Sequence, residues 1–384
     1  MNKRAITAGV EPVPDFGSAR TRHQRARAAG LDPDYWYPVE FVAKVKPGQV
    51  VEVVFWNKPI AVFRGEDGVL RAIDNRCAHR QLKLSEGKVV GCELACLYHG
   101  WRHDGQGNVS AVPHDLFGHR VPKTKLDHYP VREEYGLIWL FPGDPARSES
   151  QSIPVIPELA DSAAWHCVPV DVTWRGHHSM IIDNVSDFTH AYLHRKYRPF
   201  TQARMTSLSV DDQQVAVSYR TQVGGNRFTE AFLDPHVDRG SIRLCYQYPY
   251  QWSDTGGKIK HWCFVLPVDE RTTRCFFVFL FAPDLYRIPL LPVKLPRPLV
   301  TALLKVARRV YLLPLLDQDR VAIEAEQRAH ERHHQAPIPE VNPAVTEFQR
   351  LTINKWAQYV GNADRPPARR SRQAATEDSS GDDL

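Results

Sequence analysis

Short hydrophobic runs separated by turn residues fill the first third of the chain and predict β-strands. Residues 50–56, 60–64 and 69–73 are rich in β-branched and aromatic side chains, which favour strands. The run 65–68, Gly-Glu-Asp-Gly, lies between the last two and is typical of a tight turn. The pattern therefore predicts a small β-rich unit, of the kind that holds a prosthetic group at the tips of its loops.

The middle of the chain contains longer strand patterns. They predict a curved antiparallel sheet built from residues 168–174, 214–222, 241–250, 258–268 and 273–282. Between the first two of these, residues 179–195 have a pattern that favours a helix. We therefore expect a second unit that is larger than the first and combines strands with helices.

Helical patterns dominate the last third of the chain and predict helices that close the sheet. Residues 298–313 and 317–332 are two such segments. Asn342-Pro343 is typical of an N-cap followed by proline in the first helical position. The helix that follows places one apolar face toward the core, made of Val345, Phe348, Thr352, Trp356 and Tyr359.

These patterns divide the chain into four parts and give an α+β fold class. Residues 1–34 are polar and basic, and we expect a flexible arm with one short helix near 20–29. Residues 35–150 form the β-rich domain, which ends at a polar and proline-rich boundary. Residues 154–361 form the larger domain, and the polar tail 362–384 is expected to be disordered.

Composition narrows the class of protein. The 384 residues are 43% hydrophobic and carry a net charge of +5, which is typical of a soluble protein of two domains. The cluster of Arg20, Arg22, Arg25 and Arg27 has no Phe, Tyr or Trp between its members, so nucleic-acid binding is not expected. No apolar stretch follows the basic start of the chain, and five of the seven cysteines show no pairing pattern. A cytoplasmic location is the prediction.

Two cysteines and two histidines form the first chemical motif. Cys77-x-His79 and Cys96-x-x-His99 place one thiolate and one imidazole in each of two short loops. This donor set suits a [2Fe–2S] cluster in which two histidines bind one iron and two cysteines bind the other. A structural zinc site is the alternative, but zinc sites usually pair Cys with Cys and His with His.

The second motif is His190-x-x-x-His194, in the segment 179–195 that is predicted to be a helix. Two histidines four residues apart project from one helix face and can chelate one metal. A carboxylate from elsewhere would complete the two-histidine, one-carboxylate site of non-haem Fe(II) oxygenases, which leaves positions open for O₂ and substrate. An acidic run downstream, beginning Asp317-Gln318-Asp319, offers that carboxylate.

At these residues the chain resembles the Rieske non-haem iron oxygenase family. The cluster motif continues as Tyr98-His99-Gly100-Trp101, as in that family, whereas Gln81 stands where many members have glycine. The run beginning at Asp187, D-x-x-H-x-x-x-H, resembles the monooxygenase branch that includes dicamba monooxygenase, although many members space the two histidines one residue wider. The resemblance implies a Rieske domain joined to a helix-grip catalytic domain.

The resemblance also implies roles for individual residues. His190 and His194 would bind the mononuclear iron, with Asp319 as third ligand and Asp317 as the runner-up. Asp187 would carry electrons between the centres by bonding to a cluster histidine and to His190. A homotrimer is implied, in which each cluster serves the neighbouring iron. No dinucleotide-binding motif is present, so a separate ferredoxin or flavin reductase would supply the electrons.

The function predicted from the sequence is therefore oxidation of an organic molecule by O₂. The many aromatic residues and the leucine-rich segment 298–316 favour a hydrophobic or aromatic substrate. That segment is amphipathic and basic, and it fits either a peripheral membrane contact or a helix packed on the sheet. The competing hypotheses are a Rieske electron-transfer protein with a non-catalytic binding domain and a zinc-stabilised binding protein.

Overall fold

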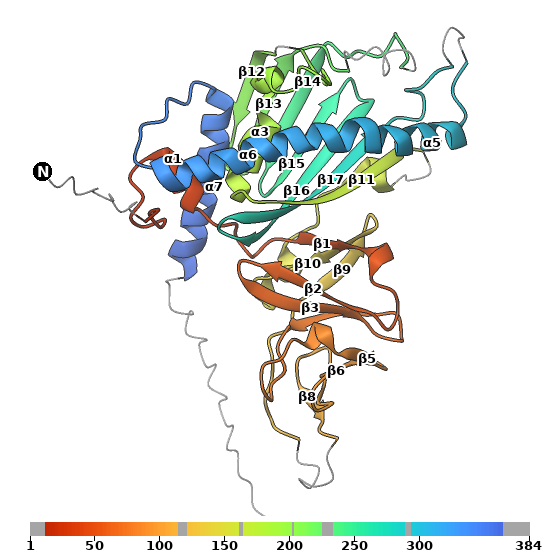
Figure 1. Cartoon of the computed structure of the whole chain (residues 1–384), viewed down its shortest axis with the longest axis vertical. Helices are drawn as coiled ribbons and strands as arrows, with labels where there is room; N and C mark the ends of the chain where they lie inside the picture. Colours follow the sequence, from red (N-terminus) through yellow and green to blue (C-terminus); the bar gives the residue numbers. More distant parts are fainter. Residues whose placement is uncertain are drawn as a thin grey trace, which may run out of the picture.

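A computed structural model describes residues 12–113, 121–160, 164–201, 203–224, 233–288 and 293–363. Strands make up its lower half and a strand–helix layer its upper half (Figure 1). The α+β fold class predicted from the sequence is confirmed.

Three small antiparallel sheets form the first domain. One has the order β1-β10-β9, the second β2-β3-β4 and the third β5-β6-β7-β8. Their strands are β1 (Tyr37–Phe41), β2 (Val50–Phe55), β3 (Lys58–Arg64), β4 (Leu70–Asp74), β5 (Lys88–Val90), β6 (Glu93–Ala95), β7 (Arg102–His103), β8 (Val109–Ala111), β9 (Val131–Glu134) and β10 (Leu137–Leu140). The predicted strands near 50–73 are all present. Short strands joined by tight turns leave two loops, after β4 and after β6, at the far end of this domain (Figure 1).

A seven-stranded antiparallel sheet forms the base of the second domain. Its order is β11-β17-β16-β15-β14-β13-β12, so the first strand pairs with the last. The strands are β11 (His166–Trp174), β12 (Arg204–Val210), β13 (Gln214–Arg220), β14 (Ser241–Gln247), β15 (Tyr250–Thr255), β16 (Ile259–Asp269) and β17 (Thr272–Phe281). The strand predicted at 241–250 corresponds to β14, after which the chain turns at residues 248 and 249. Strand β15, which follows this turn, was not predicted from the sequence.

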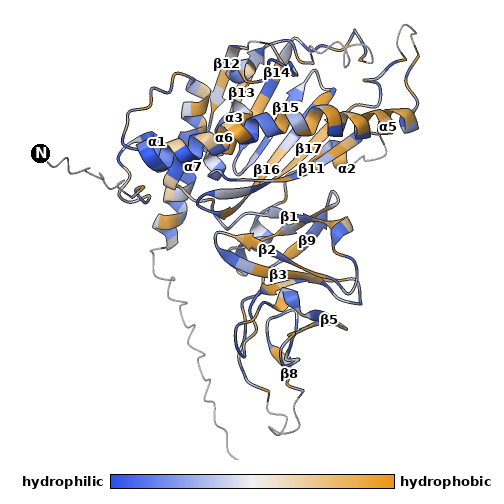
Figure 2. Cartoon of the chain, viewed as in Figure 1, coloured by the Kyte–Doolittle hydropathy of each residue, from blue (hydrophilic) through white to orange (hydrophobic). Residues whose placement is uncertain are grey.

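Helices cover one face of this sheet. The segments α5 (Arg297–Ala307), η6 (Arg308–Leu312, a π-helical turn) and α6 (Leu313–His333) form one continuous rod across the strands (Figure 1). The sequence predicted two separate helices here. Hydrophobic residues concentrate on α5 and the adjacent part of α6, whereas the end of α6 beside α1 is hydrophilic (Figure 2). No helix in the described part of the chain has the length and apolar character needed to cross a membrane.

The final helix begins as predicted. Helix α7 (Pro343–Ala363) follows Asn342, whose side-chain oxygen accepts a hydrogen bond from the backbone N–H of Ala344 at 3.0 Å. Val345, Phe348 and Thr352 are buried on its inner face, as the periodicity predicted, whereas Trp356 and Tyr359 are only half-buried. Beyond Ala363, the predicted disordered tail lies outside the described residues.

The predicted short helix near 20–29 is present, but the prediction that the arm is flexible is wrong for the part of it that the structure describes. Helix α1 (Arg22–Ala28) begins at a capping box formed by Thr21 and Gln24, and it packs against α3 (His178–Ser186) and α7. Arg27 is 6% exposed and forms ion pairs with Asp183 and Glu326. The basic composition suggested a solvated segment, but this arginine has two acidic partners that are distant in sequence, the buried Asp183 and the half-exposed Glu326.

Candidate functional site

The two cluster loops hold their four predicted ligands in two pairs. Cys77 and Cys96 are buried, whereas His79 is exposed and His99 half-buried, and the Nδ1 atoms of the two histidines lie 3.1 Å apart. The indole of Trp101 stacks on the His79 ring at 4.6 Å between centroids. Each loop is closed by backbone hydrogen bonds around its cysteine, including Cys77 N–H to Leu82 and Cys96 N–H to Trp101.

This pairing fits a two-iron cluster better than one zinc ion. Donor atoms on the same tetrahedral zinc lie roughly 3.3–3.8 Å apart. No three of these four described side chains bring their ligand atoms within 4.8 Å of one another. Burial, with the neighbouring Cys96, raises the pKa of Cys77 to about 11, so this thiol needs a metal's positive charge to ionise near neutral pH.

His103 supports the first cluster loop, a role that the sequence did not predict. His103 is fully buried on β7, and its Nε2 accepts a hydrogen bond from the Ala78 N–H at 3.3 Å. Burial lowers the pKa of His103, which keeps the ring neutral and able to accept. Its position two residues after Trp101 was the available signal.

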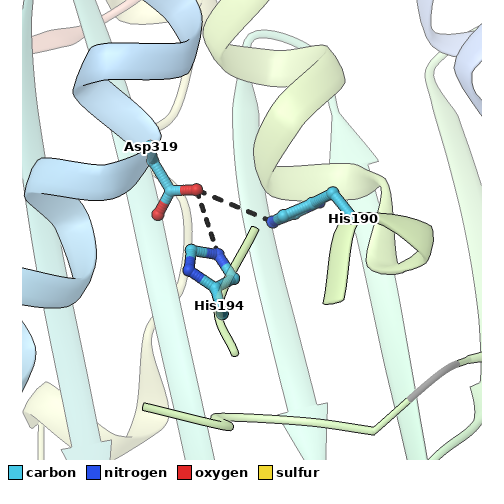
Figure 3. A group of neighbouring side chains, drawn as sticks. All are labelled: His190, His194 and Asp319. Atoms are coloured by element: carbon cyan, nitrogen blue, oxygen red, sulfur yellow. Dashed lines mark ion pairs between the residues drawn. The ribbon is translucent and has the colours of Figure 1, made fainter. Parts of the chain in front are cut away.

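The second site brings together His190, His194 and Asp319 (Figure 3). The Asp319 Oδ1 atom lies 3.6 Å from Nε2 of His190 and 3.2 Å from Nε2 of His194. Within the described residues this is the only group of three or more potential ligands whose donor atoms converge within 4.8 Å. Two imidazoles and one carboxylate on one side of a space fit a non-haem iron site.

The two histidines do not come from one face of a regular helix. Helix α3 ends at Ser186, Asp187 has an extended conformation, and residues Phe188–Tyr192 form the 3₁₀ segment η5. His190 itself is non-helical, with φ −82° and ψ 19°. The predicted helix 179–195 is therefore wrong beyond residue 186. The kink supplies the convergence that the i, i+4 argument attributed to a helix.

Hydrogen bonds to the outer ring nitrogens orient both histidines. The Nδ1 of His194 lies 3.0 Å from Oε1 of Gln318, and the Nδ1 of His190 contacts the backbone carbonyl of Asp187. When Nδ1 donates to an oxygen in this way, Nε2 is the lone-pair nitrogen that faces a metal. Burial lowers the pKa of His190, which favours the neutral form that binds metal.

The structure distinguishes the two candidate carboxylates. Asp319 faces inward from α6, with 10% of its side chain exposed, and accepts a hydrogen bond from Asn184 at 3.3 Å. Asp317 has 60% of its side chain exposed and forms an ion pair with Arg320 at 2.8 Å. Two residues along a helix point about 200° apart, so only one of the pair can face the histidines.

Asp187 lies beside this site but is bonded differently from the predicted bridge. Its carboxylate accepts hydrogen bonds from the N–H and hydroxyl of Thr189 and from Asn342 Nδ2 at 2.9 Å. It is the backbone carbonyl, not the carboxylate, that contacts His190. Within one chain, the cluster loops lie at the opposite end of the molecule from the layer that holds His190 (Figure 1). The electron-bridging role of Asp187 therefore stays a prediction.

A cavity of about 260 Å³ adjoins the three residues. Its walls come from the kinked segment after α3, from the inner face of β14 to β17, and from the rod formed by α5, η6 and α6. Phe277, Phe279, Leu304 and Leu316 are among the mostly apolar side chains that line it. Such a space suits a hydrophobic ligand.

Comparisons with known proteins agree with this arrangement. Residues 35–119 match the Rieske [2Fe-2S] domain, and residues 174–359 match the vanillate O-demethylase oxygenase C-terminal domain. The 4beta-methylsterol monooxygenase of Methylococcus capsulatus is 45% identical over 347 residues, which cover 90% of this chain and 94% of that protein. The chain belongs to the Rieske non-haem iron oxygenases.

Other relatives are more distant. The chlorophyllide a oxygenase of Arabidopsis thaliana is 32% identical over 41% of this chain and 28% of that protein. The crystal structure of dicamba monooxygenase bound to dicamba shares the fold, with a TM-score of 0.69 and 20% identity over 88% of this chain and all of the other.

Membership of this Rieske oxygenase family decides several predictions. The enzyme is an oxidoreductase that carries a [2Fe–2S] cluster and non-haem iron, as predicted. The pure electron carrier and the zinc-binding protein are not supported, because the full-length relative is a monooxygenase. The fold of the second half matches that of an oxygenase, as the resemblance implied.

Proposed function

We propose that this Rieske oxygenase oxidises a hydrophobic polycyclic molecule, and that a methyl group of a 4-methylsterol is its site of attack. The observation that carries the proposal is the apolar cavity whose wall contains His190, His194 and Asp319. The sterol class is suggested by the name of the relative that is 45% identical over nearly the whole chain. Sterols bury large apolar surfaces, which this lining favours.

Each predicted ligand has a role in this proposal. Cys77 and Cys96 would hold one iron of the cluster and His79 and His99 the other, while His190, His194 and Asp319 would hold the mononuclear iron. Iron at the second site supplies the activation of O₂, with electrons that arrive through the cluster. The ring of Phe200 packs edge-on against His190 at 5.4 Å and His194 at 5.7 Å and keeps water away from them.

Electron delivery is proposed to involve neighbouring chains and a separate donor. The cluster loops belong to the strand domain in the lower half of Figure 1 and the histidine site to the strand–helix layer in the upper half, which supports a head-to-tail homotrimer in which one chain's cluster faces another chain's Asp187. A ferredoxin or flavin reductase would donate the electrons. Light scattering of the purified enzyme tests the assembly, and a monomeric mass would contradict it.

A membrane contact through 298–316 is a further part of the proposal. Leu299, Val306 and Val310 are each more than half exposed, beside the basic Lys305 and Arg309, while the other face of the same rod lines the cavity. A surface helix of this kind would let an insoluble substrate enter from a bilayer. Co-sedimentation with anionic vesicles tests this contact. Protein that stays in the supernatant with neutral and anionic vesicles alike would contradict it.

The function is tested by turnover with a surrogate ferredoxin, its reductase, NADH and a 4-methylsterol. We expect O₂ uptake that depends on the sterol, together with a product that mass spectrometry shows to contain added oxygen at the methyl group. Small polar aromatic acids serve as the matched control. Turnover of those acids without any sterol oxidation would contradict the proposed substrate class.

A further inference from the structure

Polar side chains in the cavity gather in two places. One is the group of His190, His194 and Asp319, which the kinked segment and α6 provide. The other lies on the sheet, where Ser253 of β15 and His261 of β16 face the same cavity. The second place has no function in the metal chemistry described above.

Ser253 and His261 form a directly opposed cross-strand pair. They are register partners, and the serine Oγ lies 2.5 Å from Nδ1 of the imidazole. The next position on β17 is Phe279, whose ring packs beside His261 at 5.8 Å between centroids. Ser253 is 3% exposed, so its hydroxyl is fixed on the histidine. Thr255 and Lys260 also line this part of the cavity, but Lys260 forms ion pairs with Glu158 and Asp254. The adjacent strand β17 contributes only phenylalanines to the lining.

This geometry determines which atom of His261 is available to a ligand. Burial lowers the pKa of His261 to about 4, so the ring is neutral and has one N–H. Among the described residues, Ser253 is the only hydrogen-bond partner of the ring. If the serine hydroxyl donates to Nδ1, the proton of the ring is on Nε2, the remaining polar atom of a side chain that lines the cavity.

We propose that His261, held by Ser253, binds a single oxygen atom of the substrate through Nε2, a hydroxyl or keto group on an otherwise hydrocarbon skeleton. This inference rests on the proposed function and extends it. The kinked segment after α3 and helix α6 place the metal ligands on one wall of the cavity, and the sheet places this pair on another. A rigid substrate whose oxygen is held at the sheet presents a fixed part of its skeleton to the metal, so the pair selects both the substrate and the carbon that is oxidised.

The expected effect follows from the cost of an unpaired polar group. A substrate hydroxyl that enters an apolar cavity without a partner loses its hydrogen bonds to water. The Nε2–H of His261 loses its hydrogen bonds in the same way when the bound ligand has no hydroxyl group. A site built to bond such a group therefore favours the hydroxylated ligand over its deoxy analogue, here by about tenfold to a hundredfold.

The test compares two probes on the purified holoenzyme: a 4-methylsterol and the hydrocarbon that lacks only its hydroxyl. Their dissociation constants are measured by equilibrium binding from cyclodextrin. We expect the wild type to favour the sterol at least about tenfold. His261→Phe should bring that ratio to about one, and Ser253→Ala should lower it severalfold because the ring then loses its fixed tautomer. The exposed Ser209→Ala on β12 should leave it unchanged.

The ratio separates recognition from general damage, because a destabilised fold weakens both probes alike. Ser253→Ala keeps the imidazole and gives a second reading if His261→Phe does not fold. Equal affinity of the wild type for both probes, with the sterol still oxidised, would overturn this inference and leave the proposed function standing. Failure to bind either probe would contradict the sterol class and the inference with it.

Discussion

Replacement of Asp319 by asparagine is expected to lower substrate oxidation by at least about a hundredfold, while Asp317→Asn keeps most of it. Loss of a partner that only orients a metal ligand costs roughly 10–100-fold, and the loss of a charged ligand should cost more. The Oδ1 atom of Asp319 lies 3.2 Å from Nε2 of His194, whereas Asp317 is exposed and forms an ion pair with Arg320. The initial rate of sterol oxidation with a surrogate donor measures both variants.

Asp317→Asn is a matched control, since it makes the same chemical change two residues away on the same helix. The cluster should be unaffected in both variants, so reduction of the cluster by the donor should be normal. Equal rates for Asp319→Asn and the wild type would show that another group completes the metal site. A loss confined to Asp317→Asn would reverse the assignment of the third ligand.

Replacement of Arg27 by methionine is expected to lower the free energy of unfolding by about 3–5 kcal/mol, the usual cost of breaking a buried ion pair. The guanidinium bonds to Asp183 and Ser179 at 2.7 Å each, and it joins α1 to α3. Without it, a buried carboxylate loses its compensating charge. Denaturant unfolding measures the change, and the exposed Arg25→Met should stay within about 0.5 kcal/mol.

The effect of Arg27→Met should grow with pH. Burial raises the pKa of Asp183 to about 6, against about 3.9 in the unfolded chain, although Arg27 opposes the shift. The folded state therefore binds more protons between these values, and its stability falls as the pH rises through them. Loss of Arg27 raises this pKa further, so the cost is larger at pH 8 than at pH 5. The double variant with Asp183→Asn should recover stability and lose this dependence.

The sequence predicted most of the candidate site because its residues are of metal-binding types and lie at recognisable spacings along the chain. The Cys77 and His79 half-motif, its Cys96 and His99 partner, and the two histidines near 190 are local patterns that need no fold to be seen. The choice of Asp319 over Asp317 came from the resemblance, and the helix orientation supports it. Local patterns, however, say nothing of the kink after Ser186, because several residues on either side of it favour a helix.

Long-range partners were the part that the sequence could not supply. Arg27 resembles its exposed neighbours in composition, and only the packing of α1 against α3 reveals its buried carboxylate partner. From the sequence, His261 was a histidine in a predicted strand with no recognisable partner. The strand register of the structure places Ser253 directly opposite it. The cavity itself depends on a rod that begins at residue 297 and strands that end at 281. Such contacts follow from tertiary structure, not from periodicity.

The most direct test of the two-centre account is the content of iron and acid-labile sulfide per chain, in the wild type and in His190→Ala. The account predicts about three irons and two sulfides in the wild type. It predicts about two irons with unchanged sulfide in the variant, because the cluster has its own ligands. About two irons in both metal-replete proteins would show that His190, His194 and Asp319 hold no iron and would contradict the proposed oxygenase site.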